Sequence, residues 1–365
     1  MKHFKLTSTT KVNIYGVTLY QLELTIDCKW GKKGDKGGWI ESENLSNGNA
    51  RVSGNAWVSG NAQVYGDAHV SENACVFGNA CVYGNAQVYG DARVYGDTQV
   101  YGDARVYGDA CVYGDARVSG NACVSGNAHV SGNAYVYGDA QVSGNACVYG
   151  DTQVSENACV YGDAQVYGDA HVSENACVSG NAWVYGNAQV YGDACVYGDT
   201  QVSGNACVSG NACVSENARV SGNACVYGDA HVYGNAWVYG DTQVSGNACV
   251  YGDAHVSENA CVYGDAQVYG DAQVYGDARV SGNACVYGNA HVYRNTWKKS
   301  PLQIQGSKHF FNVCSKTNIR IGCHEFTFEY WKENFETIGK NNRYSKDEID
   351  EYGLYIDLAI KLKSL

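Results

Sequence analysis

Proline is nearly absent from this chain, which has one proline among 365 residues. The 45 glycines recur with a period of six rather than three, which excludes collagen and a flexible linker. There is no long apolar run, so no transmembrane helix is expected. The first residues, Met-Lys-His-Phe, lack the apolar core of a secretion signal, and we therefore expect a cytoplasmic protein.

Lysine is absent from residues 50–293, which carry 18 Asp and 5 Glu against 6 Arg, a net charge of −17. An acidic surface repels phosphate groups, so we expect no direct binding to nucleic acid and no binding to an anionic membrane. The simplest interpretation of the charge is solubility of a long sheet surface. The alternative is a mimic of nucleic acid that occupies a DNA-binding partner, although the Asp residues are scattered among Asn and form no continuous stripe.

One six-residue unit, Ala-x-Val-(Tyr/Ser)-Gly-(Asn/Asp), is repeated without interruption from Ala50 to Val292. One valine every six residues from Val52 onward makes 41 units. Within a unit, Ala and Val alternate with x and Tyr/Ser, which is the pattern of a short strand with one inward and one outward face. Hexapeptide repeats of this kind stack as parallel β-helices, and three units per coil would make about 14 coils.

The pair Gly-(Asn/Asp) marks the corners of the coil. Glutamate replaces the corner glycine at five places, namely Glu72, Glu156, Glu174, Glu216 and Glu258. We therefore infer that the glycine position does not always require a positive φ. The prediction is that the following Asn or Asp holds the left-handed corner, because these types tolerate that region best among non-glycine residues.

The unit resembles the hexapeptide signature of left-handed parallel β-helix proteins, over about two thirds of the chain. The resemblance implies an all-β, left-handed coil, an exception to the right-handed crossover rule. The best-known members of that family are acyltransferases; others are structural. The chain is most similar to long regular repeat proteins of bacteria and phages with no known activity, including the lead-in Gly-Gly-Trp-Ile-Glu at residues 37–41 and the tail motif Ile-Arg-Ile-Gly-Cys-His at 319–324.

Three domains are predicted: an N-terminal β-hairpin cap over residues 1–45, a solenoid over 46–297 and a C-terminal cap with two helices over 298–365. In the first domain, Lys11 to Leu24 is expected to form a hairpin around Gly16. Lys29 to Gly38 is expected to be a loop that leads into the first coil, without the spacing of a P-loop. Trp39 and Ile40 are predicted to cover the open end of the coil.

The C-terminal domain is predicted to contain short strands at Leu302–Ile304 and Asn318–Ile321. A helix is expected from Phe326 to Ile338, ended by Gly339. Ser345 and Glu348 form a capping box for a second helix through about Lys363, whose apolar side comprises Ile349, Tyr352, Tyr355, Ile356 and Ile360. We expect this helical pair to cap the last coil.

Cysteine is frequent at the outward x positions. With 18 residues per coil, one face carries Cys159, Cys177, Cys195 and Cys213 on successive rungs, and another carries Cys207 above Cys225. Side chains in register point in parallel, which suits a disulfide poorly, so free thiols are expected. Such a ladder of thiols could bind soft metals, but it lacks paired Cys-x-x-Cys spacing and tetrahedral closure, so no metal site is predicted. Single-base codon changes link the x-position residues, and drift of a duplicated unit also explains the pattern.

Six histidines also occupy x positions: His69, His129, His171, His231, His255 and His291. The resemblance to acyltransferases would make one of them a general base. An uninterrupted repeat offers no loop to build a cleft, so no catalytic residue and no cofactor is predicted.

Tyrosine is the largest outward apolar resource. Stacking of rings on neighbouring rungs is the first expectation, and a surface for a partner is the second. The possible interaction surface comprises Tyr83, Tyr89, Tyr95, Tyr101, Tyr107, Tyr113, Trp57, Trp183 and Trp237.

The favoured hypothesis is a non-catalytic structural or protein-interaction rod that presents its faces and caps to a protein partner, with a homo-oligomer as an option. The alternatives are an acyltransferase with an acyl-CoA donor and an acidic mimic of nucleic acid.

Overall fold

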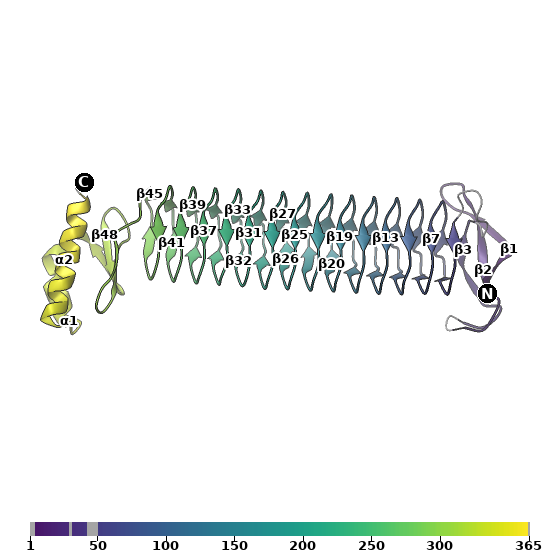
Figure 1. Ribbon diagram of the computed structural model, residues 1–365, viewed down its shortest axis with the longest axis horizontal. Helices are drawn as coiled ribbons and strands as arrows, with labels where there is room; N and C mark the ends of the chain where they lie inside the picture. The colour runs from purple at the N-terminus through teal and green to yellow at the C-terminus, as the bar shows by residue number, and fades with distance from the viewer. Residues whose placement is uncertain (1–3, 29–30, 42–49, 364–365) are drawn as a thin grey trace. The chain divides into compact units, whose positions relative to one another are not determined.

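Short parallel strands make up most of the computed structural model, which describes residues 4–28, 31–41 and 50–363. The chain divides into two compact units, residues 1–198 and 199–365. In both units a strand pairs in parallel with the strand 18 residues further along, as Val88 does with Val106. The strands make up about 14 turns of β-solenoid (Figure 1). The predicted all-β parallel solenoid is confirmed, and its handedness stays a prediction.

The first unit begins with β1 (Phe4–Val12), β2 (Thr18–Leu24) and β3 (Lys36–Ile40). β1 and β2 form the predicted antiparallel hairpin. The coil strands of this unit are β4 (Arg51–Val52), β5 (Trp57–Val58), β6 (Gln63–Val64), β7 (His69–Val70), β8 (Cys75–Val76), β9 (Cys81–Val82), β10 (Gln87–Val88), β11 (Arg93–Val94), β12 (Gln99–Val100), β13 (Arg105–Val106), β14 (Cys111–Val112), β15 (Arg117–Val118), β16 (Cys123–Val124), β17 (His129–Val130), β18 (Tyr135–Val136), β19 (Gln141–Val142), β20 (Cys147–Gly150), β21 (Gln153–Val154), β22 (Cys159–Val160), β23 (Gln165–Gly168), β24 (His171–Val172), β25 (Cys177–Val178), β26 (Trp183–Gly186), β27 (Gln189–Val190) and β28 (Cys195–Val196).

The second unit continues the same pattern. Its coil strands are β29 (Gln201–Val202), β30 (Cys207–Val208), β31 (Cys213–Val214), β32 (Arg219–Val220), β33 (Cys225–Val226), β34 (His231–Val232), β35 (Trp237–Val238), β36 (Gln243–Val244), β37 (Cys249–Val250), β38 (His255–Val256), β39 (Cys261–Val262), β40 (Gln267–Val268), β41 (Gln273–Tyr275), β42 (Arg279–Val280), β43 (Cys285–Val286), β44 (His291–Tyr293) and β45 (Thr296–Trp297).

The interior of each coil is a column of valine and alanine. The repeat valines from Val58 to Val292 are fully buried, and so are the alanines from Ala62 onward. Threonine replaces alanine at four inward positions, and Thr98 and Thr152 are fully buried as predicted. The alternation of inward and outward side chains therefore follows the sequence pattern.

The prediction for the coil corners was wrong. The residue at the glycine position, not the Asn or Asp, has positive φ, and this includes all five glutamates, with φ between 57° and 63°. Corner backbones of successive coils stack closely: a Cβ at Gly138 would lie 2.8 Å from the backbone nitrogen of Glu156. Glutamate is tolerated there because hydrogen bonds between coils, such as Asn55 N to the Glu72 carbonyl at 2.7 Å, dictate the backbone conformation.

The Asn and Asp side chains instead form ladders along the corners. The Asn79 amide donates to the Asp97 carboxylate at 2.8 Å, and Asn61 donates to Asn79 at 3.2 Å. The amide of one coil thus donates to the carbonyl or carboxylate of the next, which explains why only these two residue types occupy the position.

The start of the solenoid is covered by β3. It pairs with β2 on one side and in parallel with β6 on the other, so it links the hairpin to the coil. Ile40 is fully buried, as predicted, whereas Trp39 lies on the outward face in register with Gln63. Gly37 allows the close approach, because a Cβ there would lie 2.7 Å from the Trp57 ring. Residues 29–30 of the predicted loop and 46–49 of the predicted solenoid domain lie outside the described residues.

The second unit ends in a small domain of its own (Figure 1). Its antiparallel strands are β46 (Gln303–Gln305), β47 (Phe310–Val313), β48 (Asn318–Ile321) and β49 (His324–Thr327), followed by α1 (Phe328–Asn341) and α2 (Lys346–Lys363). The two predicted helices are confirmed, and so is the capping box, because Ser345 and Glu348 exchange backbone-to-side-chain hydrogen bonds. The sequence analysis missed β47 and β49.

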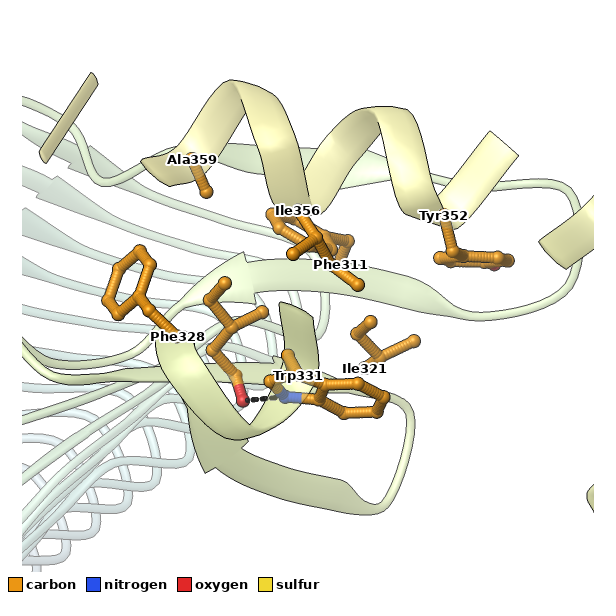
Figure 2. Packing of buried hydrophobic residues seen from close by; sticks show 8 residues of the cluster. Phe311, Ile321, Phe328, Trp331, Tyr352, Ile356 and Ala359 are labelled. Atoms are coloured by element: carbon orange, nitrogen blue, oxygen red, sulfur yellow. Dashed lines mark hydrogen bonds between the residues drawn. The ribbon is translucent and has the colours of Figure 1, made fainter. Parts of the chain in front are cut away.

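The core of this domain lies between the sheet and the helices. Figure 2 shows Phe311, Ile321, Trp331 and Ile356 packed together, and the Trp331 indole donates to the carbonyl of Ile319 at 2.8 Å. Gly339 lies inside α1 and does not end it. A Cβ there would lie 2.6 Å from Ile349, so the glycine permits close contact between the helices.

The last coil is closed by the sheet of this domain, which corrects the expectation that the helices cap it. The Gln303 and Asn312 side chains bond to the backbone of β43 and β44. The Phe310 ring packs against Gly288, where a Cβ would lie 2.8 Å from it. The helices pack mainly on the other elements of the domain.

Candidate interaction surfaces

Tyrosine rings on the outward faces of the first unit stack along the coil. Tyr83 and Tyr101 lie 5.0 Å apart between ring centres with planes 5° apart. The predicted pairs Tyr89–Tyr107 and Tyr95–Tyr113 have the same separation. The stacking expected from the sequence is thus confirmed, and it stabilises neighbouring rungs because the rings shield each other from water.

These tyrosine ladders are half-buried and uncharged. Burial, reinforced by the neighbouring Tyr15 and Tyr101, raises the pKa of Tyr83 to about 12. Tyr15, from the hairpin, lies 6.3 Å from the Tyr83 ring and 6.2 Å from the Tyr65 ring, so it covers the start of one ladder. What remains accessible is a narrow apolar edge with phenol groups.

A longer tyrosine ladder in the second unit was not among the predicted surface residues. It runs through Tyr233, Tyr251, Tyr269 and Tyr287, with ring centres 4.9, 4.9 and 5.6 Å apart. The signal was present in the sequence as tyrosines 18 residues apart.

The three tryptophans of the predicted surface are not brought together. Trp57 is only 6% exposed, because it packs under Gly37, so it adds nothing to an exposed surface. Trp183, in the first unit, is 40% exposed. Trp237, in the second, is 41% exposed and is sandwiched by the Arg219 guanidinium at 4.9 Å and the His255 ring at 5.3 Å.

The most exposed leucines of the C-terminal domain form a stripe on α2 that the sequence analysis missed. We call Leu354, Leu358 and Leu362 the leucine stripe; they are 69%, 42% and 47% exposed. The buried side of the same helix carries Tyr352 and Ile356. A helix that is apolar on both sides is typical of one covered on both sides. The spacing of four residues was the available signal.

An open pocket of about 420 Å³ in the second unit is the only place where a predicted histidine adjoins several polar groups among the described residues. His291, Asn312 and Arg320 line it. Burial, with a smaller effect of Arg320, lowers the pKa of His291 to about 4. A histidine with that pKa is neutral but weakly basic at neutral pH, so it suits hydrogen bonding better than general-base catalysis.

The cysteines of the predicted ladder are in register where each unit can be followed. Cys159 pairs with Cys177, and Cys177 with Cys195. Cys207 pairs with Cys225, and Cys213 with His231. No described cysteine is in a disulfide, and no group of three or more metal-ligating side chains occurs within residues 4–28, 31–41 and 50–363.

No helix in the described part of the chain is both long and apolar enough to cross a bilayer.

Comparison with protein families identifies the architecture. Eight segments of the chain, within residues 86–287, match the family described as YdcK β-solenoid repeat; they are 86–102, 98–114, 116–132, 140–156, 188–204, 218–234, 242–258 and 272–287. The chain is therefore a β-solenoid repeat protein of the YdcK type. No curated protein matches it.

Proposed function

We propose that this protein is a non-catalytic structural or interaction protein whose C-terminal domain binds a protein partner through the leucine stripe of α2. The observation that carries the proposal is the exposure of Leu354, Leu358 and Leu362 on the side of α2 opposite its buried face. Three large apolar side chains in a row are costly to leave in water, and burying the exposed part of each contributes about 1 kcal/mol.

The partner proposed is a protein with a complementary apolar surface. The leucine stripe lies beside acidic Asp350 and Asp357, which are both exposed. An apolar stripe flanked by carboxylates fits a basic, amphipathic segment of a protein better than a membrane surface or nucleic acid, both of which carry negative charge. The proposal includes a cytoplasmic location and no cofactor.

The solenoid supports a scaffold role more than catalysis. The repeat from Ala50 to Val292 has no inserted loop, and its inward positions are filled by valine and alanine. The one histidine beside a polar pocket, His291, has a pKa about two units below the range in which a general base works best at neutral pH. The tyrosine ladders then serve chiefly to stabilise the coil.

Photo-crosslinking in source cells tests the proposal. A photoreactive phenylalanine analogue is placed at Leu358 in the full-length chain, and at Tyr330, an exposed residue of α1, as the matched control. We expect a crosslinked protein at position 358 that is absent at 330 and is lost when Leu354→Glu is added. A crosslink to a second copy of the chain identifies the partner as itself. Equal labelling at both positions, or coenzyme A bound to the purified protein, overturns the proposal.

A further inference from the structure

We propose that cysteines stacked on successive strands form two-coordinate binding sites for a soft cation with a filled d shell, of which Cu(I) is the probe used below. The sites are Cys207 with Cys225 in the second unit, and Cys177 with Cys159 or Cys195 in the first. This inference is independent of the proposed partner surface.

Strand register brings the thiols together. Cys207 and Cys225 are direct partners in β30 and β33, and strands in a sheet lie about 4.8 Å apart. Two metal–thiolate bonds of about 2.3 Å, placed end to end, span roughly 4.6 Å. A cation midway between two stacked sulfur atoms therefore fits the spacing of the rungs without movement of the backbone.

The orientation that disfavours a disulfide favours this site. A disulfide needs sulfur atoms about 2.05 Å apart, so two parallel side chains would have to tilt toward each other. A bridging cation instead lies on the line between the sulfur atoms, and each Cβ–Sγ bond then stands nearly perpendicular to that line. Such a bent arrangement at sulfur is the normal geometry of a metal-bound thiolate.

The electrostatics of the pair also point to a cation. Burial, and next the neighbouring Cys207, raise the pKa of Cys225. Burial and then Cys177 do the same for Cys159. Two thiolates at rung spacing repel each other, and a cation between them removes the repulsion. Binding one Cu(I) converts two thiols into two metal-bound thiolates and releases two protons, so affinity should rise with pH.

The absence of a third ligand selects the kind of metal. Zinc requires four ligands in a closed site, and the described residues form no cluster of three or more. Thiolates prefer soft ions such as Cu(I), which accept two ligands in a line. The net charge of −17 on residues 50–293 favours the approach of any cation.

Paired variants of the full-length chain test the assignment. The ladder variant combines Cys177→Ser with Cys225→Ser, which removes the shared member of each site. The control variant combines Cys123→Ser with Cys261→Ser, two thiols whose strand partners are Arg and Gln. Both variants lose two thiols at outward positions, so folding and thiol number are matched, and circular dichroism checks that the coil is retained.

The measurement is a titration of fully reduced protein with Cu(I) in competition with a coloured Cu(I) chelator. We expect wild type and the control variant to bind two tight equivalents and the ladder variant to lose both, with affinity at least tenfold weaker. X-ray absorption should show two sulfur neighbours and no third ligand. Equal loss in both variants, no competition with the chelator, or three or more sulfur neighbours overturns the proposal.

Discussion

The side-chain amide of Gln303 takes the place of a strand beside Tyr287. Its Oε1 accepts the backbone N–H of Tyr287 at 2.7 Å, and its Nε2 donates to the carbonyl of Cys285 at 2.7 Å. Asn312 repeats the device on the next side of the coil, where its Nδ2 donates to the carbonyl of His291 at 2.7 Å. A last rung with unpaired backbone groups would recruit another chain, and these amides prevent it.

Replacing Gln303 should expose that edge. Gln303→Leu leaves the Tyr287 N–H and the Cys285 carbonyl without partners, which costs about 1–3 kcal/mol locally. We expect loosening of the last coil, and concentration-dependent self-association in light scattering. The control is Gln305→Leu, an exposed position whose amide contacts only the carbonyl of Gly306. A Gln303→Leu variant that stays as monodisperse as the control would contradict the edge-closing role.

Two buried threonines in identical sequence surroundings should respond in opposite directions to alanine. The Thr98 hydroxyl donates to the Tyr95 carbonyl at 2.6 Å, whereas the Thr152 hydroxyl is buried without a hydrogen-bond partner. Thr98→Ala should lower the free energy of unfolding by about 1 kcal/mol, and Thr152→Ala should leave it unchanged or raise it by a similar amount. Thermal unfolding of both variants side by side decides this; equal shifts of the same sign would refute it.

The corner glutamates should differ in what they contribute. Glu156 has φ 57°, a conformation that costs a non-glycine residue about 1–2 kcal/mol, part of which glycine loses again as chain entropy. Glu156→Gly should therefore stabilise the first unit by roughly 0.5–1 kcal/mol.

Glu72→Gly is the matched comparison. The Glu72 carboxylate accepts the backbone N–H of Gly90 at 2.9 Å, so its removal also loses a charge-assisted hydrogen bond. We expect no gain in melting temperature for this variant. A larger gain than that of Glu156→Gly would show that the hydrogen bond is not stabilising.

Acid should weaken the second unit through His291. Burial, followed by the charge of Arg320, lowers the pKa of His291 to about 4, against 6.5 for the free side chain, while Glu325 opposes the shift. The unfolded state therefore binds more protons between pH 6.5 and 4, and stability falls as pH falls through that window. Because the ring is partly exposed, we expect a loss of about 1–2 kcal/mol rather than the full linkage value.

Comparison with His291→Gln isolates this effect from the titration of the carboxylates. Unfolding of both proteins is followed at pH 7 and pH 4 at the same ionic strength. The wild type should lose more stability than the variant over this interval. Parallel losses would mean that His291 is not held neutral by the fold.

Several elements followed directly from local chemistry. The alternation of Ala and Val with outward residues predicted the coil, because a period of two leaves only one way to bury the apolar side chains. The capping box of Ser345 and Glu348 predicted the start of α2, because both hydrogen bonds lie within one turn of helix. The stacking of Tyr83 on Tyr101 followed from a register of 18 residues.

Other elements depended on contacts that no local pattern contains. The positive φ at Glu72 was missed because residue preferences favour Asn or Asp, whereas the backbones of adjacent coils dictate the corner. Trp57 was placed at the surface by its outward position, but Gly37, distant in sequence, brings β3 over it. The exposure of Leu358 could not be told from burial until the packing side of α2 was known.

The sequence by itself determined the repeating unit, the inward and outward faces and the helices of the last domain, since these depend on periodicity and short-range hydrogen bonds. The tertiary structure decided how the solenoid is closed and which apolar side chains stay exposed. Closure depends on single side chains such as Gln303 that meet unpaired backbone groups far along the chain, and exposure depends on which neighbour covers each face.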